Sequence, residues 1–326
     1  MKIALTGAAG HLGSAILPAL HAAGYSIKAL IKDSESSQTG LPVEIVRGDL
    51  LNAGSLRELL KDCEGLIHCA ALISINGDPD GMVYRTNVEG TKLLLEIAAE
   101  SGIKRVVHIS SIHAFQQNPR FETLDEDRET VTKKAFAYDR SKKAGQEIAL
   151  SMNRPGMEAL VMNPTSIIGP YDEKPSRMGK VIIDLCNGRL PFIFQGGFDF
   201  CDSRDVARAI VNGLKMGRPG EKYILGGKWH SFKQLTQLLS GVSGKKIQAF
   251  NLPPLAGRLG LPFVYGLARL KKNEPLYTGE ALEAIVSGNR KINSEKAIRE
   301  LDYRIRPLED TLRDTFSWFR QKGYLV

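Results

Sequence analysis

The sequence predicts an α/β fold, in which a doubly wound parallel sheet with helices on both faces is followed by a smaller C-terminal domain. Three observations lead to this fold. The chain opens with an apolar strand pattern, a glycine-rich turn and a helical pattern over residues 3–16. Strand and helix patterns then alternate as far as residue 111, which is typical of parallel sheets. The 326 residues, of which 43% are hydrophobic, suffice for one large unit and a smaller companion.

The charge of the chain bears on its partners. The net charge is +8, from 44 basic and 36 acidic residues. The basic residues are scattered, and no basic stripe interleaved with aromatic residues is visible. The charge therefore indicates anionic cofactors or substrates, and it argues against nucleic acid.

The cysteines and the apolar segments indicate a location. The first apolar residues already belong to the first strand, and no secretory or membrane-spanning segment is visible, so we expect no membrane partner. The cysteines show no C-x-x-C spacing and stand among apolar residues; they are Cys63, Cys69, Cys186 and Cys201. We therefore expect buried thiols in a reducing cytoplasm, with no metal site.

The opening strand and helix flank a glycine-rich turn. Gly7, Gly10 and Gly13 follow the apolar residues 3–5, and a helical pattern begins at Ser14. Such a turn directs unpaired backbone N–H groups and the positive end of the helix dipole to one point, which is a seat for a pyrophosphate. Gly7 would allow the tight turn, Gly10 the approach of a phosphate, and Gly13 the close packing of helix and strand. An ordinary strand–turn–helix joint is the structural alternative.

The second strand, residues 26–31, ends at a lysine. In NAD-binding units an acidic residue about 20 positions beyond the glycines accepts the ribose hydroxyls. Lys32 stands at this place, with Lys28 earlier on the same face of the strand. A cation here favours a 2′-phosphate, so the sequence predicts NADP, and Asp33 keeps NAD as the alternative. Without a ligand, Lys32 would be a solvated lysine at a strand end.

Three further strand patterns end near the same edge of the predicted sheet. Residues 43–46 precede Asp49, whose carboxylate suits the adenine amino group, with a helix cap as the alternative. Residues 65–71 run into small side chains, against which a flat ring can lie. A helix is predicted over 84–101, and residues 105–111 form the fifth strand. Ligands should therefore lie beyond the carboxyl ends of these strands.

A tyrosine and a lysine follow in a helical stretch. Tyr138 and Lys142 are one turn apart and project to the same side. A nearby ammonium favours the phenolate, so we expect the pKa of Tyr138 to fall from its usual value of about 10. Ser111 is placed to hold a reacting carbonyl oxygen beside Tyr138, and Ser110, which points to the opposite face of the strand, is the close alternative. An exposed pair on a helix is the structural alternative to catalysis.

Together these segments resemble the extended short-chain dehydrogenases/reductases. The matching pieces are TGAAGHLG, IKALIKD, GDL, HCAA, TNVEGTKLLLEIAAESGIKRVVHISS, YDRSK and NPTSIIGP, with a further stretch at 198–227. The most similar branch includes dihydroflavonol reductases, 3β-hydroxysteroid dehydrogenases and sugar-nucleotide epimerases. The resemblance implies a Rossmann-like cofactor domain over 1–165, to which a helix and a strand near 203–226 return. It also implies a substrate-binding domain over 166–326.

The resemblance also assigns roles to individual residues. Tyr138 would be the general acid/base, Ser111 would polarise the carbonyl, and Lys142 would assist Tyr138 and bind the nicotinamide ribose. Lys32 matches the arginine that selects NADP in dihydroflavonol reductases. The other cofactor contacts would be Gly7, Gly10, Leu12 and Gly13 at the pyrophosphate, Asp49 and Leu50 at the adenine, Ala70 and Ala71 at the ribose, Asn87 near the site, and Pro164, Thr165 and Ser166 under the nicotinamide.

The second half of the chain is less regular. Beyond Pro170, prolines and glycines interrupt the pattern, as the loops of a small substrate domain would. The apolar segment 252–270 carries Arg258 and several helix breakers, so we expect a lid over the substrate or packing between domains. One amphipathic helix is predicted over 298–319. Phe198 stands where sugar-nucleotide enzymes carry a phosphate-binding arginine, which weakens an epimerase assignment.

The expected function is that of an NADP-dependent oxidoreductase, which reduces a carbonyl of a small or medium-sized, partly apolar molecule. The cofactor would supply the hydride and Tyr138 the proton. A nucleotide-sugar epimerase or dehydratase that retains NAD is the first alternative. The second is a cofactor-sensing or scaffold protein, against which Tyr138 and Lys142 argue, because a sensor needs no proton donor. The family resemblance implies a homodimer formed through the helices near 84–101 and 138–152.

Overall fold

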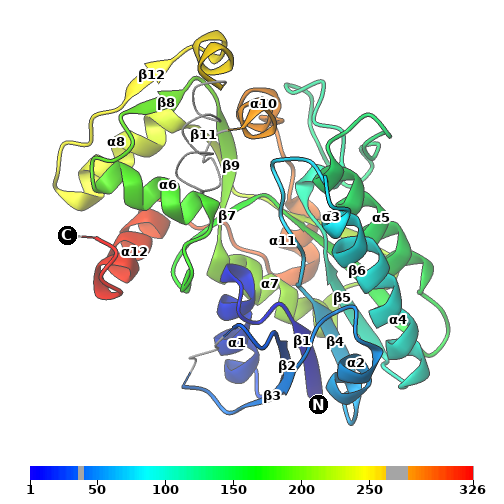
Figure 1. Ribbon diagram of the computed structural model, residues 1–326. Helices are drawn as coiled ribbons and strands as arrows, with labels where there is room; N and C mark the ends of the chain where they lie inside the picture. Colours follow the sequence, from blue (N-terminus) through cyan, green and yellow to red (C-terminus); the bar gives the residue numbers. More distant parts are fainter. Residues whose placement is uncertain (36–39, 262–277, 326) are drawn as a thin grey trace.

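A seven-stranded parallel sheet forms the centre of the molecule in the computed structural model, which describes residues 1–35, 40–261 and 278–325 (Figure 1). The strand order is β10-β6-β5-β4-β1-β2-β3, and every neighbouring pair is parallel. Because the order reverses beside β1, a crevice opens there at the carboxyl ends of the strands. The strands are β1 (Lys2–Thr6), β2 (Ser26–Ile31), β3 (Val43–Arg47), β4 (Gly65–His68), β5 (Arg105–Ile109), β6 (Glu158–Pro164) and β10 (Lys222–Leu225).

The central strands are apolar on both faces. In β1, Ile3 and Leu5 pack into one hydrophobic core, whereas Ala4 between them packs into a second core on the other face. In β5, Val107 and Val106 divide between the two cores in the same way. Continuous apolar runs are therefore required here, because helices cover the sheet on both sides.

Two groups of helices provide this cover. Helices α1 (His11–Ala22) and α7 (Ser203–Met216) pack together on one face of the sheet. Helices α2 (Ala53–Leu60), α4 (Gly90–Glu100) and α5 (Ala137–Ser151) pack on the other (Figure 1). The predicted doubly wound α/β fold is confirmed.

The helix predicted over 84–101 is not regular. It consists of a short α3 (Met82–Tyr84), a π-helical turn η1 (Arg85–Glu89) and α4. Such π turns inside α-helices often occur at functional sites, because they shift the direction of the side chains by a fraction of a turn.

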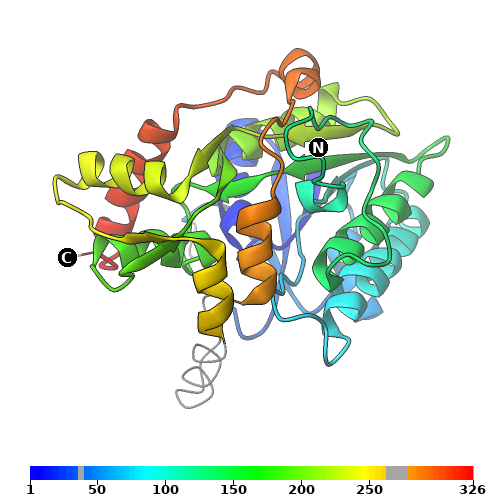
Figure 2. The same ribbon diagram turned by 90° about the horizontal axis from the view of Figure 1, so that it is seen from above.

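A smaller lobe stands beside the sheet. Its helices α8 (Phe232–Ser243) and α12 (Leu308–Gln321) lie on the side away from α4 and α5 (Figure 2). It has two small sheets: β7 (Ser166–Ile168), β9 (Gly197–Asp202) and β11 (Lys228–Ser231), and the pair β8 (Phe192–Phe194) and β12 (Phe250–Leu252). Helices α6 (Arg177–Cys186) and α10 (Gly279–Ser287) complete the lobe, and its core includes Ile182, Phe200, Leu235, Ile285 and Leu312.

The chain crosses between the two lobes more than once. Helix α7 and strand β10 return to the large sheet, where β10 pairs with β6. Helix α11 (Glu295–Leu301) packs against both of them. The single helix predicted over 298–319 is wrong, because the chain turns at Asp302, with a left-handed φ of 49°, and α12 begins only after Pro307. Each lobe is therefore built from segments that are distant in the sequence.

The apolar segment 252–270 is described only in part. Residues 254–261 are helical, and the backbone of Gly257 lies against Phe194 and Leu282 of the smaller lobe. Residues 262–270 lie outside the described residues, so the alternatives of a lid and of domain packing stay predictions. None of the helices in the described part of the chain combines the length and the apolar character that a membrane span needs.

Candidate active site

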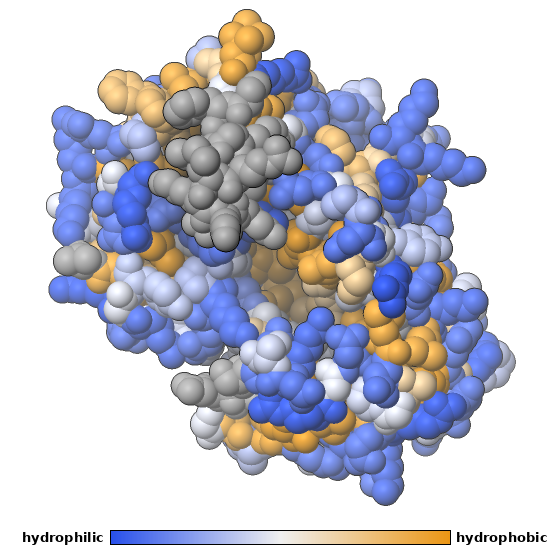
Figure 3. Space-filling view, in the orientation of Figure 1, coloured by the Kyte–Doolittle hydropathy of each residue, from blue (hydrophilic) through white to orange (hydrophobic). Residues whose placement is uncertain are grey.

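A cavity of about 560 Å³ lies at the carboxyl ends of the strands, between the sheet and the smaller lobe. Figure 3 shows the molecule hollowed at this place, with apolar residues in the recess. Eleven of the predicted site residues line the cavity: Gly7, Gly10, Leu12, Gly13, Ala71, Ser111, Tyr138, Lys142, Pro164, Thr165 and Ser166. The predicted cofactor and reaction residues thus face a common space, and their roles stay predictions.

The glycine-rich turn is closely packed at Gly7 and Gly13 and open at Gly10. Gly7 has a φ of +76°, and a Cβ there would lie 2.6 Å from the backbone nitrogen of Ala70. A Cβ on Gly13 would lie 2.0 Å from the carbonyl oxygen of Gly7. Gly10 is exposed, and a Cβ there would meet nothing closer than 3.4 Å. The open side at Gly10, before the N-terminus of α1, fits a bound pyrophosphate.

Lys32 and Asp49 form an ion pair at the ends of β2 and β3. Their Nζ and Oδ2 atoms are 3.2 Å apart, and both side chains are about half exposed. Burial would raise the pKa of Asp49, but the N–H of Leu51 and the Lys32 ammonium outweigh it and lower this pKa. Lys28 is buried and pairs with Glu44 and Glu58, so its charge is not directed toward a cofactor. Lys32 is therefore the cation of this strand that can meet a 2′-phosphate.

The adenine and ribose residues hold different positions. Leu50 is buried in the core on the α2–α4 face and does not line the cavity. The N–H of Ala70 donates to Thr6 Oγ1, and Ala71 lines the cavity. His68 is held between the hydroxyls of Thr6 and Thr91, at 2.7 and 2.9 Å, and burial lowers its pKa to about 3. This neutral histidine links the end of β4 to the end of β1 and to helix α4.

Asn87 uses its amide within the protein. It lies in the π-helical turn η1, and its Nδ2 donates to the carbonyl of Leu72 and to Ser141 Oγ, both at 2.9 Å. Its Oδ1 accepts from the N–H of Leu72 at 2.7 Å. The side chain does not line the cavity, although a place near the site is expected for it. Asn87 thus ties the loop after β4 to helix α5, which carries Tyr138.

The two serines after β5 have different partners. Ser110 Oγ donates to the carbonyl of Lys142 at 3.2 Å, so its hydroxyl joins strand and helix. Ser111 Oγ accepts from the N–H of His113 at 3.2 Å, where it caps the short helix η2 (Ile112–Ala114). The Ser111 hydroxyl also lies close enough to Tyr138 to lower the pKa of the phenol. The geometry therefore favours Ser111 as the hydroxyl beside the phenol.

The protonation of Tyr138 and Lys142 reflects their burial. Burial raises the pKa of Tyr138, and the nearby Ser111 hydroxyl offsets only part of this rise. The expected fall in the pKa of Tyr138 is wrong here, because burial dominates and Lys142 Nζ donates to the carbonyl of Ile109 at 2.7 Å. Burial also lowers the pKa of Lys142 to about 8. Tyr138 is therefore a protonated phenol at neutral pH.

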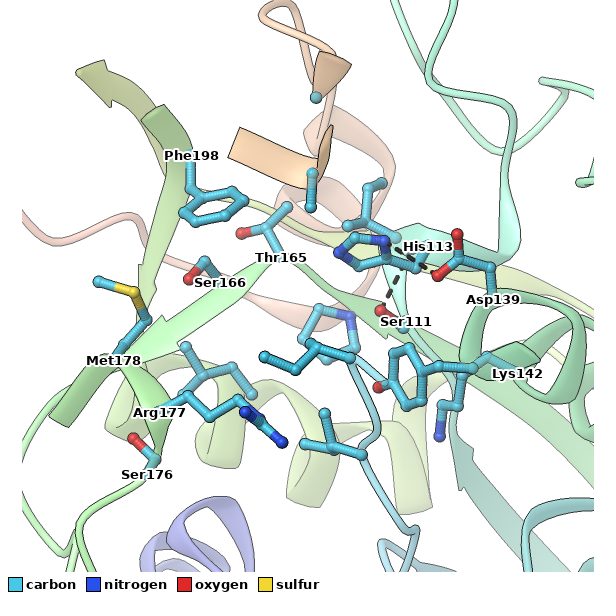
Figure 4. A pocket seen from close by; sticks show the side chains of 18 of the residues that line it. Ser111, His113, Asp139, Lys142, Thr165, Ser166, Ser176, Arg177, Met178 and Phe198 are labelled. Carbon is cyan, nitrogen blue, oxygen red and sulfur yellow. Dashed lines mark hydrogen bonds and ion pairs between the residues drawn. The ribbon is translucent and has the colours of Figure 1, made fainter. Parts of the chain in front are cut away.

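The cavity also holds polar side chains that the sequence reasoning did not single out. His113 and Asp139 face each other beside Tyr138, with Nδ1 and Oδ1 3.3 Å apart (Figure 4). Glu280 of α10 also lines the cavity, within electrostatic reach of Asp139. The sequence offered one signal for this pair: His113 lies two positions after Ser111, and Asp139 directly follows Tyr138. Within the described residues, no group of three or more His, Cys, Asp and Glu side chains is arranged to hold a metal ion.

Known proteins of similar sequence share this arrangement of segments. Residues 3–226 match the profile of the NAD dependent epimerase/dehydratase family. Sterol demethylase protein B of Methylococcus capsulatus is 30% identical over 336 aligned positions, which cover 100% of each chain. The 4-hydroxy-2-methyl-3-oxo-4-farnesyl-3,4-dihydroquinoline-1-oxide ketoreductase of Stigmatella aurantiaca is 28% identical over 93% of this chain and 92% of its own. The chain is similar to both along nearly its whole length.

A solved structure agrees in fold. The crystal structure of gox2253 superposes with a TM-score of 0.83 at 29% identity, covering 100% of this chain and 99% of the other. The likeness in fold extends over both lobes.

Proposed function

The chain belongs to the NAD-dependent epimerase/dehydratase family and is an NAD(P)-dependent enzyme of the extended short-chain dehydrogenase/reductase type; on this premise we propose that it is an NADP-dependent reductase. Its substrate is a small or medium-sized, partly apolar molecule with a carbonyl group. The observation that carries this proposal is the meeting of Ser111, Tyr138 and Lys142 at one wall of the cavity.

Each of these three side chains has a separate role in the transfer of a proton to the carbonyl oxygen. When bound, the dinucleotide supplies the hydride to the carbonyl carbon. Tyr138, kept protonated by burial, donates its proton to the oxygen on which negative charge develops. The Ser111 hydroxyl donates a hydrogen bond to the same oxygen and stabilises that charge. The Lys142 ammonium favours the phenolate that remains after the proton has left.

The preference for NADP rests on Lys32. Its ammonium is exposed at the end of β2, at the place where NAD-binding units carry an acidic residue. Asp49 holds this ammonium at the edge of the sheet, where a 2′-phosphate can join the pair. A phosphate offers more charge than the two ribose hydroxyls of NAD, so the cation favours NADP.

The apolar character of the substrate rests on the cavity walls and on two relatives. Apolar side chains from both lobes line the substrate end, among them Ile73, Ile75, Ile112, Phe136 and Phe198. The names of the two relatives refer to a sterol and to a farnesylated quinoline oxide, which both carry a large apolar hydrocarbon part. Ketones with a largely apolar carbon skeleton are therefore the first substrate class to test.

An epimerase or dehydratase that retains NAD is the second candidate, and the family to which the chain belongs is named for these activities. Lys174 and Arg177 line the cavity and would meet the phosphates of a sugar nucleotide. Phe198 argues against this candidate, because an aromatic ring offers no bidentate contact to phosphate.

One experiment separates the two candidates. The purified protein is mixed with NADPH and a panel of ketones, and then with sugar nucleotides, while the nicotinamide absorbance is followed. A reductase consumes one NADPH for each ketone. Conversion of a sugar nucleotide without net change in absorbance, together with copurifying NAD, would reject the reductase in favour of the epimerase or dehydratase.

A further inference from the structure

The wall of the cavity beside Tyr138 carries a second polar pair, His113 and Asp139. The ring centroids of His113 and Tyr138 are 6.1 Å apart in an edge-on arrangement. Figure 4 shows the His113 ring between Asp139 and the interior of the cavity, with Ser111 below it and Thr165 beside it. The two residues therefore border the space where the carbonyl oxygen would meet Ser111 and Tyr138.

Both members of the pair are held in place by the elements that carry the reaction residues. The backbone N–H of His113 donates to Ser111 Oγ, and this bond fixes the first turn of η2. Asp139 follows Tyr138 directly and lies in the first turn of α5, where a carboxylate also stabilises the helix N-terminus. A change in the position of Ser111 or Tyr138 would thus move this pair as well.

The chemistry of the pair follows from its carboxylate. A carboxylate 3.3 Å from Nδ1 favours the tautomer with the proton on that nitrogen, in which Nε2 carries the lone pair. The His113 side chain is 34% exposed, and no group of the described residues binds its Nε2. Because His113 lines the cavity, this acceptor is available to a bound molecule.

The charges around the pair decide which substrate group it takes. Glu280 lies within electrostatic reach of Asp139, and burial raises the pKa of Glu280. Tyr138 is a neutral phenol, Arg140 is exposed on the same helix, and the Lys142 ammonium is directed at the carbonyl of Ile109. Two carboxyl groups at this end disfavour a substrate carboxylate. A hydroxyl, which is neutral and can donate, suits the His113 acceptor.

We propose that His113, oriented by Asp139, accepts a hydrogen bond from a substrate hydroxyl on the carbon next to the reacting carbonyl, so that the enzyme prefers α-hydroxy ketones. This deepens the proposed function and rests on it for the position of the carbonyl. His113 is then a residue that contacts substrate, and Asp139 is a positioning residue that acts through it.

The test uses four probes that share one aromatic frame. They are acetophenone, 2-hydroxyacetophenone, 2-methoxyacetophenone and phenylglyoxylate, of which only the hydroxy ketone carries a neutral donor. One neutral hydrogen bond contributes about 0.5–1.5 kcal/mol, which corresponds to a preference of about two- to twelvefold. We expect the hydroxy ketone to exceed acetophenone in kcat/KM by this factor. The methoxy ketone should match acetophenone, and phenylglyoxylate should be weaker.

Three variants of the full chain connect this preference to the pair. His113→Phe keeps a ring but removes the acceptor, so the ratio of the two kcat/KM values should fall to about one. Asp139→Ala should lower the ratio as well, whereas Asp139→Asn, whose amide oxygen still accepts from Nδ1–H, should restore it. Since the readout is a ratio within each variant, a general loss of activity cancels.

Dissociation constants from titration calorimetry, measured without turnover, separate this inference from the proposed function. If no ketone is reduced but the hydroxy ketone binds more tightly in a His113-dependent manner, the proposed function fails, whereas the contact between His113 and the hydroxyl holds. If ketones are reduced but the ratio is one in the wild type, or is unchanged in His113→Phe, the inference is overturned. Equal preference for the methoxy ketone, or tighter binding of phenylglyoxylate, would overturn it too, because His113 would then be a donor.

Discussion

Lys142 shows how the position of a single charge changes the chemistry of the site. A lysine one turn from a tyrosine predicts a lowered phenol pKa, yet the ammonium donates to the Ile109 carbonyl and the pKa of Tyr138 rises. The spacing of the two residues in the sequence gave the correct helix face. It did not give the backbone carbonyl that competes for the ammonium, because that partner lies on a strand 33 residues away.

The pH dependence of the reaction should report the charge on Lys142. Burial lowers its pKa to about 8, so the ammonium is present below that pH and is lost above it. Because this charge stabilises the phenolate left by proton transfer, kcat/KM for ketone reduction should fall as the pH rises through about 8. In Lys142→Arg the fall should move to higher pH, since a guanidinium stays charged. A wild-type profile that is flat across this range contradicts the assigned role.

Cofactor preference should depend on Lys32. Replacing it with alanine removes a charged contact to the 2′-phosphate, which contributes about 1.5–3 kcal/mol, or roughly 10- to 100-fold in affinity. Titration of the protein fluorescence should show this loss for NADPH and little change for NADH. Lys92→Ala, at an exposed lysine on α4, is the matched control. Equal losses for both cofactors would show that Lys32 does not select NADP.

At the scale of elements, the glycine-rich turn was predicted from the spacing of its three glycines. The structure shows that these glycines have different roles. Gly7 and Gly13 are required by the protein's own backbone, whereas Gly10 has a φ of −84° that suits any residue. The same spacing also occurs in turns that bind nothing. Only the distances to neighbouring backbone show which glycine leaves room for a ligand.

This difference predicts opposite results for two alanine variants. Gly13→Ala forces a Cβ against the Gly7 carbonyl and should lower the free energy of unfolding by about 1–3 kcal/mol. Gly10→Ala should leave it within about 0.5 kcal/mol but remove most of the dinucleotide affinity. Thermal denaturation and cofactor titration of both variants measure this. Normal dinucleotide binding by a folded Gly10→Ala protein would argue against a pyrophosphate at this turn.

The hydrophobic patterns did not predict the breaks that the structure shows in two of the expected helices. The π turn at residues 85–89 contains Asn87, whose side chain bonds to Leu72 and Ser141, and these partners come from tertiary structure. The break at Asp302 depends on a left-handed residue that is not glycine. The apolar period continues across both places, so hydrophobic periodicity alone predicts one helix in each case.

At the scale of the whole molecule, the large sheet was predictable because β1, β3, β4 and β5 are each followed along the chain by a helix that covers the sheet. The smaller lobe was not, because its contacts join distant segments. Thr278 donates to the carbonyl of Ile75 at 2.6 Å, and Leu124 forms a bridge with Ile292. The residues that shape the substrate end of the cavity come from such loops, and no local pattern specifies them. The homodimer through α4 and α5 stays a prediction, which sedimentation at micromolar concentration tests.

The central claim is that the phenol of Tyr138 gives a proton to a carbonyl that NADPH reduces in this cavity. The most direct measurement is the rate of NADPH oxidation with an accepted ketone, for the wild type and for Tyr138→Phe under saturating NADPH. General acid catalysis by a positioned side chain contributes about a hundredfold to ten-thousandfold, so the variant should be slower by that factor while it still binds NADPH. A Tyr138→Phe protein that turns over the ketone at the wild-type rate would contradict the claim.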